Sequence, residues 1–366
     1  MKNTFGNSLQ ITIFGESHGP YIGAVLDGLA PGIDINDEFI KKQLLLRRPS
    51  GDISTKRVEA DEYSIVSGAF NGKTTGTPLC ILIPNTSQKS ADYGENAERL
   101  ARPGHADYTA HVKYGGFEDY RGGGHFSGRI TAALVAAAGV VIPELNKKGI
   151  FIGTHIKSVG NVNDRDFVDY RADIDFLSSE TFAVLSSKAG EKMQELIKKA
   201  AAEGDSVGGI LESAVIGLPA GLGEPWFDTV EGVLSHALFS IPAVKGIEFG
   251  AGFSGVNGSG SEFNDAFFSE NGEIKTKTNN NGGINGGITN GMPVTVRLAV
   301  KPTPSIYKEQ DTVELNSGEN RKLVINGRHD PAIIHRARVV ADSVIALTVY
   351  DLLAARFGTD FFGGRN

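Results

Sequence analysis

The sequence is poor in the residues that build disulfide frameworks and metal sites. Cys80 is the only cysteine among 366 residues, so no intrachain disulfide and no cysteine-built metal site can form. It lies in the apolar run 78–84, and because free cysteines are commonly buried we expect a buried, reduced thiol. The eight histidines give no cluster with the spacing of metal ligands. We therefore expect no bound metal.

Long apolar segments and runs of one charge sign are missing as well. No stretch approaches the roughly 18 apolar residues that a membrane span needs, and the first residues do not resemble a signal peptide. The formal net charge is −7 without any long run of lysine and arginine, which argues against a nucleic-acid-binding surface. We expect a soluble, cytoplasmic protein that binds neither membranes nor nucleic acids. With 40% hydrophobic residues it can bury a large core, in one large domain or two ordinary ones.

Glycine, by contrast, is abundant and clustered. The 47 glycines make up roughly 13% of the chain, against about 7% in average proteins. They gather at 122–124, 250–260 and 282–291. Clusters of this kind are typical of flexible loops, and also of loops where the backbone approaches a ligand closely.

Hydrophobic periodicity and capping residues predict a mixture of strands and helices. Asn36 is expected to cap a helix that runs to residue 47, with acidic residues in its first turn. Two further helices are apolar nearly all round, which predicts that they are buried. The expected strands are 9–14, 22–26, 64–70, 77–84 and 293–300, and the other expected helices are 105–114, 127–145, 190–203 and 332–356.

Three short motifs match known signatures but lack the required context. The segment 15–19 (GESHG) fits the G-x-S-x-G pattern of hydrolases, yet a strand rather than a helix should follow it. The segment 67–74 approaches a P-loop, but a strand follows it too, so we interpret it as a hairpin turn. The G-x-G-x-x-G at 250–255 runs into polar loop sequence instead of opening a helix.

Four loops combine glycine with groups suited to anion binding or proton transfer, and Arg47 and Arg48 add a further cationic point. Arg129 opens a buried apolar helix, where a charge is costly unless an anion meets it. Either a bound ligand or a buried Asp or Glu can supply that anion. The four loops are 15–19, 102–107, 122–129 and 327–331.

Six motifs distributed over nearly the whole chain resemble those of the chorismate synthase family in order and spacing. They are GESHG (15–19), RPGHADYT (102–109), YRGGGHFSGR (120–129), GGINGGITNG (282–291), KPTPS (301–305) and GRHDP (327–331). The resemblance implies an α+β fold in which long helices lie between β-sheets, as a single domain over residues 1–366 that assembles into a homotetramer.

The same resemblance implies a lyase. Enzymes of this family convert 5-enolpyruvylshikimate 3-phosphate to chorismate by an anti-1,4 elimination of phosphate, the last step of the shikimate pathway to the aromatic amino acids. They require reduced FMN although no net redox change occurs. Since no reductase segment is present, we expect NADPH to act only indirectly, through a separate flavin reductase.

Site residues follow from the resemblance motif by motif. His18 resembles the general acid that protonates the departing phosphate, His105 a residue beside the flavin ring, and Asp330 an acid that works with the flavin nitrogen receiving the ring hydrogen. Ser17 and Ser127 resemble proton-relaying hydroxyls. The implied substrate-binding residues are Arg47, Arg102, Arg129 and Arg328. The implied flavin contacts are Arg48, His125, Phe126, Ser127, Pro242, Ala243, Gly286, Lys301, Pro302, Thr303, Pro304, Ser305 and Arg328.

The chain departs from the family pattern at a few positions. Pro242 stands where asparagine is common, Asp342 where glutamate is usual, and 48–51 is a variant of the usual basic turn. Two rival hypotheses remain from other classes: a serine hydrolase with Ser17 as nucleophile, and a non-catalytic protein that binds FMN or a phosphorylated metabolite. Retention of His18, His105 and Asp330 disfavours the second.

Overall fold

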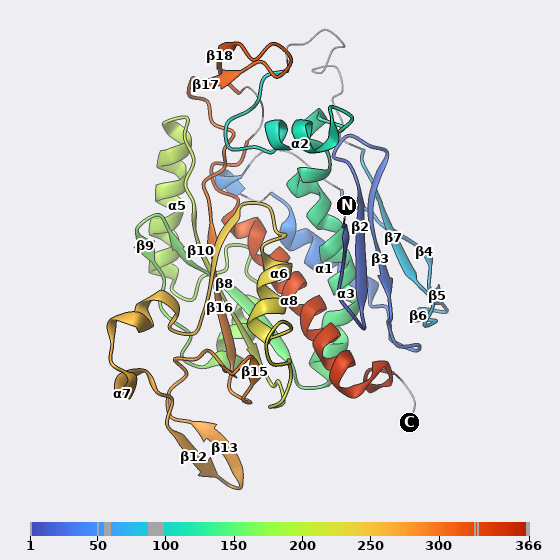
Figure 1. The fold of residues 1–366 in the computed structure, drawn as a ribbon, viewed down its shortest axis with the longest axis vertical. Coiled ribbons are helices and arrows are strands. Elements are labelled where there is room, and N and C mark those ends of the chain that lie inside the picture. The colour runs from blue at the N-terminus through green and yellow to red at the C-terminus, as the bar shows by residue number, and fades with distance from the viewer. Residues whose placement is uncertain are drawn as a thin grey trace.

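The computed structural model describes residues 2–49, 51–54, 60–86, 99–325, 327 and 329–363. Within them the chain forms two five-stranded antiparallel sheets with helices between them (Figure 1). The first sheet has the order β1-β2-β3-β7-β4, and its strands are β1 (Thr4–Phe5), β2 (Gln10–Gly15), β3 (Tyr21–Asp27), β7 (Leu79–Pro84) and β4 (Ser64–Ser67).

The second sheet has the order β11-β16-β10-β8-β9. Its strands are β11 (Val244–Phe249), β16 (Val294–Val300), β10 (Gly209–Ile216), β8 (Phe151–Val159) and β9 (Val162–Asn163). Short hairpins extend from the body: β5 (Ala69–Phe70) with β6 (Lys73–Thr74), β12 (Phe267–Glu270) with β13 (Glu273–Thr276), β14 (Ile284–Asn285) with β15 (Ile288–Thr289), and β17 (Gln310–Val313) with β18 (Asn320–Leu323).

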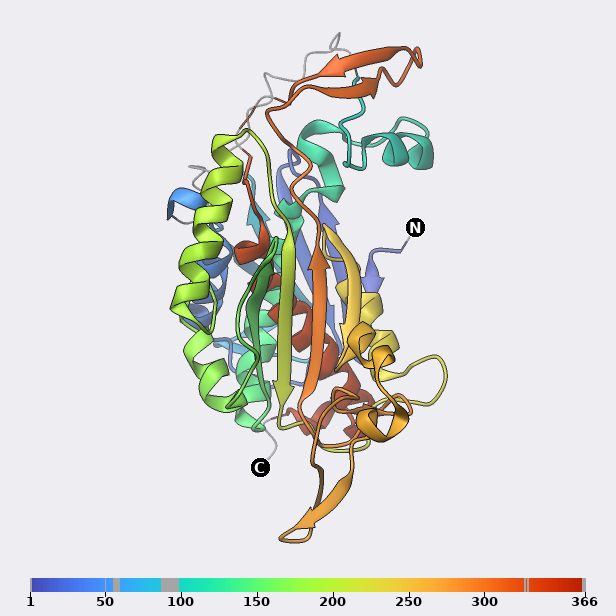
Figure 2. The same cartoon turned by 90° about the vertical axis from the view of Figure 1, so that its left-hand side faces the viewer.

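Three helices fill the space between the sheets. α3 (Thr131–Lys147) packs on β3 and β7, while α8 (Ile334–Phe357) packs on β8 and β10, and both contact α1 (Asp37–Arg47). The side view shows this layering, with α5 (Ser187–Ala202) on the outside of the second sheet (Figure 2). The remaining helices are α2 (Asp107–Tyr114), α4 (Tyr170–Leu177), α6 (Val230–Leu238) and α7 (Gly260–Phe263).

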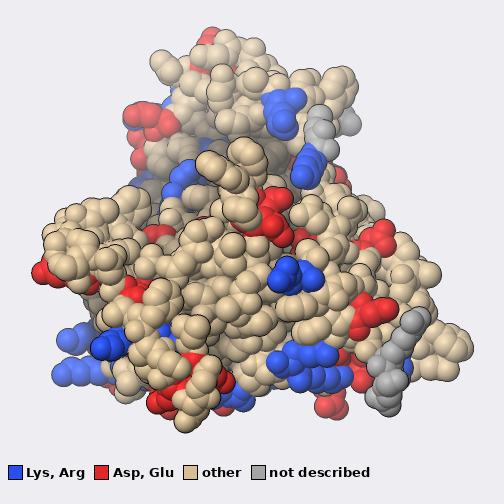
Figure 3. All heavy atoms as spheres, turned by 60° about the horizontal axis from the view of Figure 1, so that its bottom comes forward, with Lys and Arg blue, Asp and Glu red and all other residues tan. Residues whose placement is uncertain are grey.

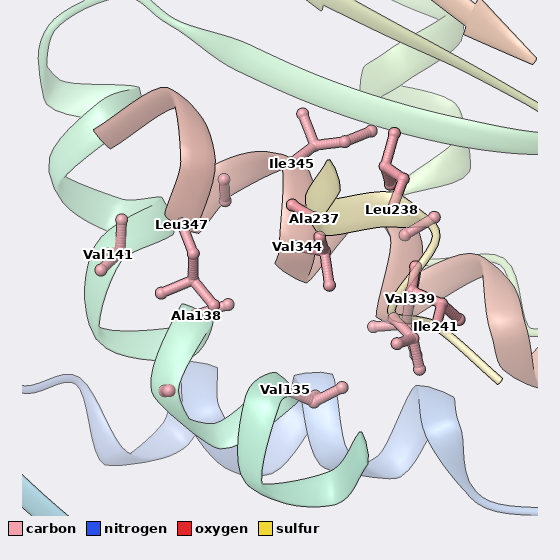
Figure 4. Close-up of a cluster of buried hydrophobic side chains, with 14 of the residues drawn as sticks. Val135, Ala138, Val141, Ala237, Leu238, Ile241, Val339, Val344, Ile345 and Leu347 are labelled. Atoms are coloured by element: carbon pink, nitrogen blue, oxygen red, sulfur yellow. The ribbon is translucent and has the colours of Figure 1, made fainter. Parts of the chain in front are cut away.

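The core lies where α3, α6 and α8 meet. Figure 4 shows Val135 and Ala138 of α3, Leu238 of α6, and Val344 and Leu347 of α8 converging on one apolar cluster. The segment Gly128–Lys147 is long and apolar enough to cross a membrane by composition, but 78% of its most apolar stretch is buried inside the protein. Its apolar character is therefore explained by its place in the core.

Most predicted elements are confirmed. Asn36 caps α1 through its side chain, whose Oδ1 accepts a hydrogen bond from the backbone N–H of Phe39 at 3.0 Å. The expected strand 64–70 is interrupted at Gly68, which adopts a φ of +78° and separates β4 from β5. A strand follows GESHG and a hairpin forms at 69–74, as the sequence context predicted. The G-x-G-x-x-G segment, expected to run into polar loop, contains a short 3-10 turn, Gly252–Asn257, and the four-residue helix α7 follows it.

Three details differ from expectation. The helix expected over 332–356 begins two residues later, because α8 starts at Ile334 and its cap position is Ile333. A 3-10 turn, Gly128–Ile130, precedes α3, so Arg129 lies just before the regular helix rather than in it. Cys80 is free but only partly buried, because it faces the opposite side of the sheet from its fully buried neighbours Leu79 and Ile81; burial still raises the pKa of its thiol.

Candidate active site

The turn between β2 and β3 carries Ser17 and His18 and packs against a loop of three consecutive glycines. The backbone N–H of Ser17 donates to the carbonyl oxygen of Gly124 at 3.0 Å. A methyl group placed on Gly122 would lie 2.2 Å from Cε1 of His18, so the imidazole rests directly on this glycine backbone. Gly122 has a φ of +60°, which glycine adopts at little cost. Glycine is thus required here both by conformation and by space.

Two buried arginines share one carboxylate beside this turn. Asp61, whose side chain is fully buried, binds Nη1 of Arg47 through Oδ2 at 3.3 Å and Nη1 of Arg129 through Oδ1. Arg47 also donates from Nε to the hydroxyl of Thr131 at 3.1 Å and from Nη2 to the carbonyl of Gly128 at 3.1 Å. Of the two explanations that the sequence left open for Arg129, the structure shows the buried ion pair. A ligand would meet guanidinium groups that are already held in place.

Asp330 is connected to the same region through Arg336. Arg336 donates from Nη1 to Asp330 Oδ2 at 2.5 Å and from Nε to the backbone carbonyl of Arg47 at 2.9 Å. The neighbouring His335 is buried, its Nε2 lies 2.6 Å from the hydroxyl of Ser54, and burial lowers its pKa to about 4. The imidazole beside Asp330 is therefore neutral near neutral pH.

The loop of residues 102–107 packs on the segment 301–305. Nε2 of His105 lies 2.9 Å from the hydroxyl oxygen of Ser305, and Nζ of Lys301 donates to the carbonyl of Gly104 at 2.6 Å. Burial, reinforced by the positive charge of Arg102, lowers the pKa of His105 to about 4. In this structure His105 is thus a neutral hydrogen-bonding group.

Arg102 is engaged inside its own loop. It donates to Asp107 from Nε and from Nη2, both at 2.7 Å, and from its backbone N–H at 3.0 Å. Although burial opposes ionisation of Asp107, these contacts hold the pKa of its carboxyl below the ordinary value. A methyl group on Gly123 would lie 3.8 Å from Arg102 Nη2 and 3.9 Å from Cβ of Ser127, which places this loop beside the glycine loop.

Most of the expected flavin contacts lie in the glycine loop, in the segment 301–305 or directly beside them. His125 Nδ1 lies 2.7 Å from the carbonyl oxygen of Gly15, and the Ser127 hydroxyl accepts from the Arg129 N–H at 3.3 Å. The ring of Phe126 meets Tyr114 edge to face. The others of this group are Ala243, whose carbonyl accepts from the Lys301 N–H at 3.0 Å, its neighbour Pro242, and Pro302, Thr303 and Pro304 in the segment already described. Arg48, directly after α1, donates to the carbonyl of Ala60.

Gly286 is not brought to this place, and Arg328 lies outside the described residues. The β14–β15 turn that contains Gly286 sits beside Val230, the first residue of α6, to whose N–H Gly287 offers its carbonyl at 2.9 Å. Gly283 contacts Pro293, just before β16 begins, whereas Lys301 comes just after β16 ends. The seven residues of β16, about 23 Å of extended chain, therefore separate Gly286 from the other contacts.

Sequence reasoning missed Asp61, Asn85 and Arg336. Asn85 accepts from Nε of Arg129 at 3.0 Å and donates to the carbonyls of Glu16 at 3.0 Å and Gly19 at 2.8 Å. A hydrogen-bonded chain thereby runs from Asp330 through Arg336, Arg47, Asp61, Arg129 and Asn85 to the turn that carries His18. The signal available in the sequence was indirect: buried arginines need a countercharge, and Asp61 is an acidic residue flanking the first sheet.

A shallow, open hollow of about 250 Å³ lies elsewhere, on the outer face of the second sheet. It is lined by Tyr170, Glu212, Asn280 and Arg297 among others, beside a fully buried His155 that bonds Asp164 and Glu212. It contains none of the predicted site residues, so we do not place the chemistry there. Among the described residues no group of His, Cys, Asp and Glu forms a metal site.

Comparisons with known proteins identify the family. The family model described as chorismate synthase matches residues 9–354. A chorismate synthase of Pyrococcus abyssi is 45% identical over 351 residues, covering 96% of this chain and 97% of the relative, and one of Dehalococcoides mccartyi is 44% identical over 355 residues, covering 96% of each. A crystal structure of chorismate synthase superposes with a TM-score of 0.76 at 27% identity, covering 96% of this chain and 94% of that one. The chain therefore belongs to the chorismate synthase family.

Proposed function

We propose that the cluster formed by the His18 turn, the glycine loop and the loops at 102–107 and 301–305 binds 5-enolpyruvylshikimate 3-phosphate and eliminates phosphate to give chorismate. Membership of the family makes the chain a lyase of this type. The observation that carries the assignment of the site is the hydrogen-bonded chain between Asp330 and the His18 turn. It joins Asp330 and the backbone of the turn that carries His18 to two arginines suited to phosphate and carboxylate.

Each residue has a distinct task in this proposal. His18 donates a proton to the departing phosphate as the general acid. Arg47 and Arg129 hold anionic groups of the substrate with guanidiniums that Asp61 has already oriented, and Arg102 and Arg328 are proposed to assist. Asp330, fixed by Arg336, takes part in transfer of the ring proton, with Ser17 and Ser127 as relays.

Reduced FMN is the proposed cofactor, and the segment 301–305 fits it. Thr303 has a buried Oγ1 that makes no hydrogen bond within the part of the chain described, which suits a ligand hydroxyl or phosphate oxygen. Lys301 adds a positive charge, and Ser305 and His105 offer a paired hydroxyl and neutral imidazole. When bound, reduced flavin supplies an electron-rich ring for the elimination without net redox change. Lys301, Thr303, Ser305 and His105 are the residues that would hold the bound flavin.

The decisive experiment is anaerobic mixing of the purified chain with chemically reduced FMN and 5-enolpyruvylshikimate 3-phosphate. We expect stoichiometric release of phosphate and formation of chorismate, and no reaction when the FMN is oxidised. Absence of phosphate release with reduced FMN would refute the proposed function. The hydrolase hypothesis predicts covalent labelling of Ser17 by a phosphonate reagent, whereas the lyase predicts none; the buried position of Ser17 favours the lyase.

We further propose that a separate reductase supplies the reduced flavin, with NADPH acting only through it, and that the protein works in the cytoplasm. Purified protein mixed with NADPH and FMN alone should not reduce the flavin at rates that support turnover. Reduction at such rates would show that the chain contains its own reductase activity.

We also propose that the chain forms one domain and assembles as a homotetramer. A single buried cluster includes residues from both sheets and from the helices between them, which supports one domain.

Figure 3 shows a face on which large areas carry no charged side chain. Large apolar side chains are strongly exposed in the described chain, with Phe227 at 93%, Trp226 at 85% and Phe253 at 80%, as expected of surfaces that are covered on assembly. If Gly286 contacts flavin, it does so in the site of a neighbouring copy. Sedimentation should give four times the 38.8 kDa chain mass.

A further inference from the structure

Asn85 uses both donors and the acceptor oxygen of its side-chain amide to join two parts of the candidate active site. It follows directly after β7. Its Oδ1 accepts from Arg129 Nε at 3.0 Å, and its Nδ2 donates to the carbonyls of Glu16 at 3.0 Å and Gly19 at 2.8 Å. Its backbone N–H donates to the carbonyl of Pro20 at 3.0 Å.

The two carbonyls bound by Nδ2 are the two ends of the turn that carries Ser17 and His18. Gly19 N–H also donates across this turn to the Glu16 carbonyl at 3.0 Å, so the turn is closed by the backbone and held from outside by Asn85. Only an amide offers two donors and an acceptor from one short side chain. Aspartate at this position would keep an acceptor for Arg129 but would present a carboxylate to two carbonyl oxygens.

We propose that Asn85 is a positioning residue for the elimination, which fixes the turn carrying His18 relative to Arg129. This inference rests on the proposed function. Arg129 is itself held by Asp61, so the proton donor and the anion-binding arginine share one hydrogen-bonded frame. Positional precision of this kind matters because a displacement of about 1 Å at a reacting group can lower a rate by about 10²-fold.

The test is Asn85→Asp, which removes both donors to the turn while retaining an acceptor for Arg129. We expect kcat to fall about 10²-fold because the turn is no longer held. KM for the anionic substrate should rise as well, because the new carboxylate lies against Arg129 Nε and offsets its charge. Asn163→Asp makes the same chemical change on the exposed strand β9, and it should leave both constants unchanged. A wild-type kcat for Asn85→Asp would overturn the inference.

A double-mutant cycle separates positioning from a general loss of stability. If Asn85 acts through the His18 turn, Asn85→Asp should add little to the defect of His18→Ala, since the group that it positions is already gone. Defects that multiply would overturn the inference. Should Asn85→Asp fold poorly, Asn85→Ser replaces it, and the amide hydrogen exchange of residues 15–19 is measured instead. Faster exchange there than in Asn163→Asp supports the inference, and equal exchange overturns it. An inactive wild type would instead refute the proposed function, and this inference with it.

Discussion

Nε2 of His105 lies 2.9 Å from the hydroxyl of Ser305, in surroundings that keep this imidazole neutral. Burial and the charge of Arg102 lower its pKa from 6.5 to about 4. Above pH 6.5 the ring is neutral in both the folded and the unfolded chain and contributes nothing to the pH dependence. Between pH 6.5 and about 4 the unfolded chain takes up a proton that the folded chain refuses, so stability falls as the pH falls.

The pH effect can be measured by urea unfolding. From the shift, His105 should lower the free energy of unfolding of wild type by roughly 3 kcal/mol between these limits. His105→Gln, which cannot titrate, should show a shallower decline over the same range. Parallel pH profiles for the two proteins would contradict the proposed neutral state of His105.

His18→Ala and His105→Ala test the roles of the two histidines in turnover. Loss of a general acid typically lowers a rate by about 10²–10⁴-fold, so His18→Ala should fall in that range. Both variants should still bind FMN, because neither loses Lys301 or Thr303, and this is measured by fluorescence quenching of the flavin. If both variants turn over at wild-type rates, the proposed roles are wrong.

Gly122→Ala should inactivate the enzyme by displacing His18. Its methyl group would lie 2.2 Å from Cε1 and 2.4 Å from Nδ1 of that ring. A left-handed φ adds roughly 1–2 kcal/mol of strain for any other residue. Gly123→Ala carries the same backbone strain with its nearest neighbour at 3.8 Å, and Gly128→Ala has neither strain nor a neighbour within 4 Å.

These three variants separate the clash from the strain. We expect Gly122→Ala to lose at least about 10²-fold in kcat, in line with misplacement of a catalytic group. Gly123→Ala should lose stability with a smaller effect on kcat, and Gly128→Ala should lose little of either. A kcat for Gly122→Ala equal to that of Gly123→Ala would show that contact with His18 is unimportant.

Local sequence signals predicted elements well, because capping and hydrophobic periodicity are local properties. Asn36 marked the start of α1, and the apolar run after Ser127 marked α3, since the interactions responsible lie within a few residues. The start of the last helix was less well predicted, since α8 begins at Ile334 rather than at residue 332 and the preceding Asp330 binds Arg336. A local pattern gives no information about such a tertiary partner.

The candidate site could be predicted as a set of motifs but not as a connected network. Asp61 and Asn85 are separated from Arg129 by 68 and 44 residues, and neither stands in a pattern that distinguishes it from a surface residue. Their importance comes from burial and from partners that only the packing of β7 against α3 brings near. The sequence motifs also did not show that Gly286 lies away from the segment 301–305. That separation depends on β16, the strand between them, which places the two loops at its opposite ends.

Asp61→Asn removes the carboxylate that Arg47 and Arg129 share while preserving the shape of the side chain. Removing one partner of a buried ion pair typically costs about 3–5 kcal/mol, so we expect a loss of that size in the free energy of unfolding. Asp175→Asn breaks an exposed pair with Arg171 on α4 and should cost less than about 1 kcal/mol.

An anion that enters the site supplies the charge that Asp61→Asn removes, so inorganic phosphate should raise the melting temperature of Asp61→Asn more than that of wild type. Scanning fluorimetry with and without phosphate measures this difference. Equal shifts in both proteins would mean that phosphate does not reach the arginine pair, and that Asp61 serves stability alone.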